Sequence, residues 1–198
     1  MSETIKNPSF RRAASWAGAL NLAYFGIEFV VALTIGSVSL FADSVDFLED
    51  ASVNLLIVLA LGWSLRQRAR LGMALAGILL LPGLATVWMA WHKFLHPLPP
   101  APALLSLTAA GAMLVNTGCA IMLARHRAHG GSLAKAAYLS ARNDVLANVA
   151  IILAGLVIAY LWRSAWPDIL VGLGIAAMNA DAAREVWTAA RDEHRAVA

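Results

Sequence analysis

The sequence has little charge and almost no cysteine. Lys, Arg, Asp and Glu together make up 14% of its 198 residues, against roughly 25% in ordinary soluble domains. A soluble chain of this length needs a larger polar surface. The single cysteine, Cys119, excludes a disulfide framework and a cysteine-ligated zinc site. Two motifs are also missing, namely a glycine-rich phosphate-binding loop and the Gly-x-Ser-x-Gly turn that carries a nucleophilic serine.

Long apolar runs occupy most of the chain. Hydrophobic residues make up 60% of it, and the mean hydropathy is +0.69. Each run has the length of about 20 residues that a helix needs to cross a bilayer. The sequence therefore predicts an all-α membrane protein with six transmembrane helices, forming one domain over residues 1–198. The predicted spans are about residues 13–35, 39–63, 71–91, 101–124, 138–162 and 169–187.

The basic residues predict the orientation of these spans. Of the fifteen Lys and Arg residues, all but Lys93 and Arg163 fall on the side of the membrane that holds both termini. Because cytoplasmic loops are enriched in Lys and Arg, both termini are predicted to be cytoplasmic. This pattern also explains the pI of about 9.4 without a nucleic-acid partner. The expected location is the cell membrane, specifically a bacterial inner membrane.

Half of the twelve acidic residues lie inside predicted spans. An acid at the middle of a bilayer costs about 2.5–3.5 kcal/mol when it faces lipid. Four such residues in the second span would together cost roughly 10 kcal/mol. They must therefore face protein, water or a cation. The six intramembrane acids are Glu28, Asp43, Asp46, Glu49, Asp50 and Asp144.

Helical spacing groups the acids of the second span on one face. At 100° per residue, Asp43, Asp46 and Asp50 fall within an arc of about 60°. Asp46 and Asp50 are one turn apart, so their carboxylates can converge on one ion. Glu49 lies at the margin of this face. No Lys or Arg within the span neutralises these charges, so bound protons or a divalent cation would relieve their repulsion.

The fifth span carries a complementary polar strip. Ser140, Asp144 and Asn148 follow one another at intervals of four residues, and Asn143 lies at the edge of the strip. Packed against the second-span aspartates, this strip would supply a third carboxylate and a hydroxyl. Such a set of oxygen atoms predicts a site for a divalent metal ion.

Several of the polar residues also have a structural interpretation. Glu28 and Asp43 are either interhelical hydrogen-bond partners or participants in metal or proton binding. Ser140 is either a ligand or a helix-packing serine. Asn143 and Asn148 are either accessory ligands or interhelical contacts.

Two histidines lie outside the predicted membrane. His126 and His129 flank Arg127 in a cytoplasmic loop. They are candidates for the capture of metal ions before transport. The alternative is that they are simply solvated residues of a basic loop.

Two stretches of the chain resemble the cation diffusion facilitator family of metal/proton antiporters. Gly36–Asp50 is similar to the motif of that family's second helix, and Ser140–Asn148 is similar to the motif of its fifth helix. The resemblance covers all six spans. It implies a six-helix cation-efflux bundle that holds its metal ion at Asp46, Asp50 and Asp144.

The chain departs from the family pattern in two respects. Ser140 stands where the family commonly has a histidine, so the donors are harder and less selective for zinc. The expected cargo is Zn, Co or a similar cation such as Fe, Mn or Cd, exchanged for protons, with no permanently bound cofactor. The family's cytoplasmic C-terminal domain has no counterpart here, which implies a short form whose homodimer depends on the helices.

Two other functions remain open on the sequence. The acids could serve a proton- or sodium-coupled transporter of another substrate. They could also hold the metal of a membrane metalloenzyme or assembly factor. No nucleophile or substrate-binding loop lies near the acids in sequence, so we do not expect an enzyme.

Overall fold

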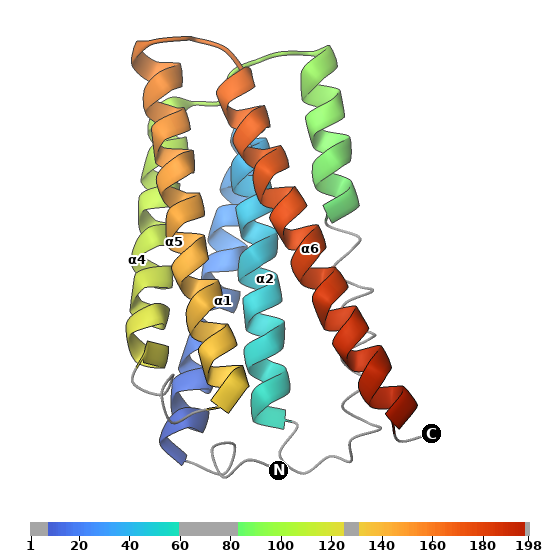
Figure 1. Cartoon of the computed structure of the whole chain (residues 1–198). Coiled ribbons are helices and arrows are strands. Elements are labelled where there is room, and N and C mark those ends of the chain that lie inside the picture. The colour runs from blue at the N-terminus through green and yellow to red at the C-terminus, as the bar shows by residue number, and fades with distance from the viewer. Residues whose placement is uncertain (1–7, 60–82, 125–130, 197–198) are drawn as a thin grey trace.

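The computed structural model describes residues 8–59, 83–124 and 131–196 (Figure 1). Within these residues the chain forms six helical segments and no strand, which confirms the predicted all-α class. The segments are α1 (Pro8–Ile35), α2 (Val38–Leu59), a helix over residues 83–95, α4 (Pro102–Ala124), α5 (Gly131–Tyr160) and α6 (Trp166–Ala196).

Three of the described helices, α1, α5 and α6, are longer than the predicted spans. α1 begins at Pro8 and α6 continues to Ala196, beyond the apolar runs predicted at 13–35 and 169–187. A hydropathy pattern detects the part of a helix that lipid surrounds, whereas backbone hydrogen bonding continues into water. Residues 60–63 and 71–82 of the predicted spans lie outside the described residues.

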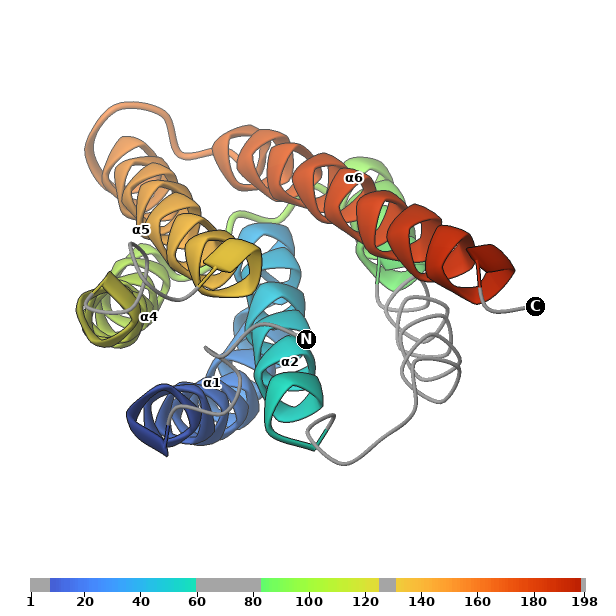
Figure 2. The same cartoon turned by 60° about the horizontal axis from the view of Figure 1, so that its bottom comes forward.

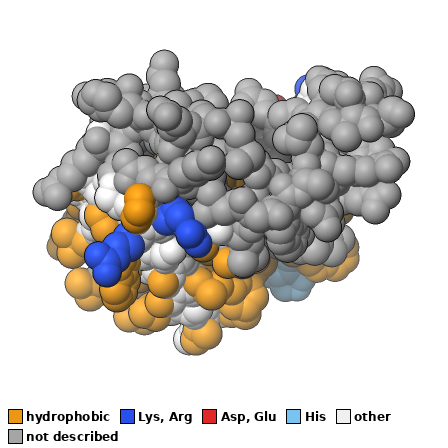
Figure 3. Space-filling view, turned by 90° about the horizontal axis from the view of Figure 1, so that it is seen from below, with side chains coloured by type: hydrophobic (Ala, Val, Ile, Leu, Met, Phe, Trp, Pro, Cys, Tyr) orange, Lys and Arg blue, Asp and Glu red, His pale blue; other side chains and the backbone are white. Residues whose placement is uncertain are grey.

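The helices form a bundle that joins neighbours along the chain and also helices far apart in it. α1 packs against α2 and α4, α5 packs against α4, and α6 packs against α2 and α5 (Figures 1 and 2). α1 begins and α6 ends at the same end of the bundle, as the distribution of basic residues predicts. Figure 3 views this end and shows Lys and Arg side chains beside apolar ones. We call the opposite end, which holds the α1–α2 turn, the outer end.

Large apolar side chains lie on the described surface, and several polar and charged side chains are buried among the apolar residues of the described interior. Trp88, Leu107 and Leu114 are exposed by 71%, 70% and 72%. Glu28 and Asp43, in contrast, are both 0% exposed. Apolar side chains on the surface, together with acids in the interior, are typical of a bundle surrounded by lipid. Within the described residues, three helical segments are long and apolar enough to span a membrane: Pro8–Ile35, Pro102–Ala124 and Asn143–Tyr160.

The turn between α1 and α2 is fixed by a glycine and a serine. Gly36 has a φ of 63°, the left-handed conformation that ends many helices, and the Ser37 nitrogen donates to the Ala32 oxygen (2.9 Å). The Ser37 hydroxyl then accepts from the Leu40 nitrogen (3.1 Å), which caps α2. The Gly-Ser pair of the predicted motif therefore reverses the chain direction at the outer end.

A buried ion pair ties three elements together at this turn. The Asp168 carboxylate, at the start of α6, accepts from the Val38 nitrogen (2.9 Å) and the Ser39 nitrogen (3.1 Å). Lys93, from the helix over residues 83–95, donates to Asp168 (2.9 Å) and to the Gly36 oxygen. The exposed fractions of the Lys93 and Asp168 side chains are 7% and 0%. We call this arrangement the Lys93–Asp168 clamp.

The clamp requires α6 to approach α2 closely. Gly172 lies one turn after Asp168, and a Cβ atom at this position would come within 2.7 Å of the Val38 backbone. Only glycine allows the two helices to lie this near one another. The small residue thus lets the Asp168 carboxylate reach the first turn of α2.

Candidate functional site

A cavity of about 120 Å³ lies between α2, α5 and α6. The three aspartates that the sequence predicts as metal ligands all line it, two from α2 and one from α5. The lining residues are Asp46, Glu49, Asp50, Asn143, Asp144, Ala147, Ile175, Met178 and Asn179. The structure therefore brings the two sequence motifs to one space, which we call the aspartate cavity.

The aspartate cavity is acidic and has no basic residue in its lining. Its four carboxylates are accompanied by two carboxamides and by apolar side chains. Carboxylates held this close repel one another unless protons or a cation neutralise them. Among the described residues, no group of three or more His, Cys, Asp and Glu side chains is arranged to hold a metal ion. A bound cation would therefore have to draw the carboxylates inward.

Asn21 of α1 supports the aspartate cavity, although the sequence did not predict it as a site residue. Its Nδ2 donates to the Asp50 Oδ2 (3.2 Å), and its Oδ1 accepts from the Cys119 Sγ (3.6 Å). The side chain is 1% exposed. Asn21 thereby connects α1, α2 and α4 beside the cavity. The sequence feature that could have indicated Asn21 is a carboxamide side chain in the middle of an apolar span.

α6 forms the third wall of the aspartate cavity through Ile175, Met178 and Asn179. The Asn179 Nδ2 donates to the Ala42 oxygen of α2 (3.3 Å). No residue of the sixth span was predicted as part of the site. Asn179 is again a lone carboxamide in an apolar stretch, but nothing in its spacing relates it to the second and fifth spans.

The remaining candidates lie in three different places. Asn143 lines the aspartate cavity. Glu28, Asp43 and Asn148 do not line it and are completely buried elsewhere in the bundle. Ser140 lies in α5, one turn before Asp144, and its side chain is outside the described part of the structure. His126 and His129 also lie outside the described residues.

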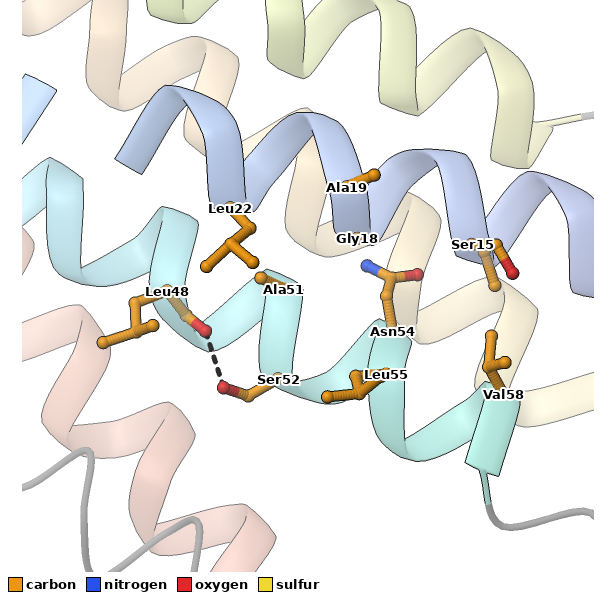
Figure 4. Close-up of a pocket in the computed structure, with 11 residues that line it drawn as sticks. Ser15, Gly18, Ala19, Leu22, Leu48, Ala51, Ser52, Asn54, Leu55 and Val58 are labelled. Carbon is orange, nitrogen blue, oxygen red and sulfur yellow. Dashed lines mark hydrogen bonds between the residues drawn. The ribbon is translucent and has the colours of Figure 1, made fainter. Parts of the chain in front are cut away.

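A larger hollow of about 440 Å³ lies between α1 and α2, away from the acidic residues (Figure 4). Its walls are mainly small and aliphatic residues such as Gly18, Leu22 and Leu55. The Ser52 hydroxyl on its wall donates to the Leu48 oxygen of its own helix (2.8 Å). No charged side chain of the described residues lines this hollow.

A helical bundle with an apolar surface and a carboxylate-lined cavity is typical of a membrane protein that carries cations. A model described as the cation efflux transmembrane domain matches residues 16–192, which is most of the chain. The chain therefore belongs to the cation efflux family, a family of transporters rather than enzymes. No curated protein compared with the chain matches it. The protein is a multi-pass cation transporter of the membrane.

Proposed function

We propose that this protein exports a divalent metal cation from the cytoplasm in exchange for protons. The observation that supports the proposal is the meeting of Asp46, Asp50 and Asp144 at one cavity without a basic residue in its lining. Three carboxylates carry more negative charge than a monovalent cation would balance. Oxygen donors of this kind are typical ligands of hard and intermediate divalent metals.

Competition between protons and metal ions for the same ligands couples the transport of protons to the transport of metal. The carboxylates bind metal only when they are deprotonated, so a proton and a metal ion compete for the same oxygen atoms. Metal would enter the aspartate cavity from the cytoplasm and bind Asp46, Asp50 and Asp144, with Ser140 or water completing the ligand set. A rocking motion of the helices would expose the site to the outside, where protonation releases the metal.

Transport into everted membrane vesicles tests this function directly. Zn²⁺, Co²⁺, Fe²⁺, Mn²⁺ or Cd²⁺ is added separately to the medium outside the vesicles, with and without a pH gradient across the membrane. We expect accumulation of at least one of these metals that falls when the gradient is collapsed. Vesicles that contain the Asp50→Ala variant provide the control. Absence of metal accumulation, together with no stabilisation of the purified protein by metal, would favour the proton- or sodium-coupled alternative.

Substitution of Ser140 by histidine should change the metal preference. If residue 140 faces Asp144 and the second-helix aspartates, imidazole would add a borderline nitrogen donor that favours zinc over manganese. We expect Ser140→His to shift transport toward zinc by about tenfold or more, which corresponds to about 1.4 kcal/mol. Competition between the two metals in vesicles measures the ratio. An unchanged ratio in a well-inserted variant would exclude residue 140 from the metal site.

The assembly that we propose is a homodimer in the cell membrane, specifically a bacterial inner membrane. The described bundle presents many large apolar side chains on its outer surface. Lipid or a second copy can cover such a surface, and small and apolar faces support helix association within a bilayer.

A further inference from the structure

A second polar cluster lies at the interface of α1, α2 and α5. Glu28, Asp43 and Asn148 are each 0% exposed. Both carboxylate oxygens of Glu28, both of Asp43 and the Oδ1 of Asn148 are buried without a hydrogen-bond partner. Buried polar atoms in native proteins nearly always have a partner, so five such atoms indicate that something is missing.

The three side chains are neighbours. The Glu28 and Asp43 carboxylates are close enough to interact electrostatically, and the Asn148 side chain lies beside the Asp43 carboxylate. They come from three different helices, so their meeting is produced by the fold rather than by the spacing within one helix. We call this set the outer cluster.

The outer cluster lies on the outer side of the aspartate cavity. α2 begins at the outer end, and Asp43 precedes Asp46 by about one turn. α5 runs in the opposite direction, and Asn148 follows Asp144 by about one turn. Each helix therefore presents a residue of the outer cluster about 5 Å beyond a residue of the aspartate cavity.

Few nearby donors can satisfy the outer cluster. The Tyr24 hydroxyl, on the same helix as Glu28, already donates to the Thr108 oxygen (2.7 Å). The Asn148 Nδ2 donates one of its two hydrogens to the Asp144 oxygen (2.8 Å), which leaves one hydrogen that can reach Asp43. The charged groups that act on Glu28 and Asp43 from the surrounding helices are themselves acids, Asp46 among them. Deprotonated carboxylates and carbonyl oxygens only accept, so bound protons or a cation can complete such a set.

We propose that Glu28, Asp43 and Asn148 form a second cation site, which receives the divalent metal ion after it leaves the aspartate cavity. This inference rests on the proposed export function and specifies its route. The metal moves by about one helical turn from one oxygen-lined position to the next. Two adjacent weak sites allow an ion to leave more readily than one tight site, because repulsion between successive ions assists release.

Metal stoichiometry tests the second site. Purified protein is equilibrated with Mn²⁺ alone, and separately with Zn²⁺ alone, and the bound metal is counted by elemental analysis. We expect two equivalents for the unmodified protein and one for the Glu28→Gln, Asp43→Asn double variant. The carboxamides keep the shape of the side chains and remove their charge. The retained equivalent also shows that the double variant folds.

Two matched variants complete the experiment. Asp181→Asn changes an exposed acid of α6 and should leave two equivalents bound. The single Glu28→Gln variant should weaken the second equivalent by about tenfold or more while leaving the first unchanged. Two tight equivalents in the double variant, or only one in the unmodified protein, would overturn the second site. Failure of the export function would appear separately, as absence of metal accumulation in vesicles that contain the unmodified protein.

Discussion

Replacing Asp50 with alanine should abolish metal transport while the protein still inserts into the membrane. The substitution removes one of the carboxylates that line the aspartate cavity. Loss of a group that only orients a metal ligand already costs 10–100-fold in affinity or activity. We therefore expect a fall of at least about 100-fold in metal accumulation per inserted protein. Insertion should be unimpaired, because an acid inside the bilayer opposes it.

Carboxamide variants separate charge from packing in this test. Asp50→Asn keeps an oxygen that can accept from Asn21, whose Nδ2 lies 3.2 Å from Asp50. Asp144→Asn leaves the aspartate cavity one negative charge short in the same way. Both should lose transport nearly as completely as Asp50→Ala, and Asp181→Asn should transport normally. Normal transport by Asp50→Ala would remove α2 from the metal site, and full metal affinity in Asp144→Asn would remove α5.

Replacing Asp168 with asparagine should destabilise the protein strongly. The carboxylate accepts five hydrogen bonds, from Ser37, Val38, Ser39 and Lys93, at 2.6–3.1 Å. Its loss leaves the Lys93 ammonium buried without a counter-charge. Breaking a buried ion pair in this way costs about 3–5 kcal/mol. Thermal unfolding in detergent should show a markedly lower midpoint for Asp168→Asn.

The partner substitution should be milder. Lys93→Met removes the cation, but the Asp168 carboxylate keeps its hydrogen bonds from the first turn of α2. The double variant should therefore be more stable than the sum of the two single losses predicts, because the two groups interact directly. Arg163→Gln, which changes an exposed cation at the outer end, should leave the midpoint unchanged. Strictly additive losses would show that the ion pair contributes nothing to stability.

Periodicity within a single helix predicted the part of the aspartate cavity that α2 forms. Asp46 and Asp50 share a face because they are four residues apart, and intramembrane acids are costly enough to require a function. The family motifs then related α2 to α5. The structure places these two residues and Asp144 at one cavity.

Contacts between helices that are distant in sequence could not be predicted in the same way. Asn21 and Asn179 reach Asp50 and Ala42 from α1 and α6. Their partners depend on how far each helix is rotated and tilted, which no spacing within one span determines. In the sequence, Lys93 is recognisable only as a basic residue on the outer side of the membrane. Its burial against Asp168 depends on three elements that meet at one turn.

The Lys93–Asp168 clamp also limits how the bundle can move. It fastens α6 to the first turn of α2 at the outer end, and the two helices diverge toward the end where α6 terminates (Figures 1 and 2). Because the clamp joins α2 and α6 at the outer end, their opposite ends can separate while the joined ends stay together. The aspartate cavity lies between α2, α6 and α5. Separation of α2 and α6 at the end where α6 terminates therefore leaves the clamp intact, whereas separation of the same two helices at the outer end would break its hydrogen bonds.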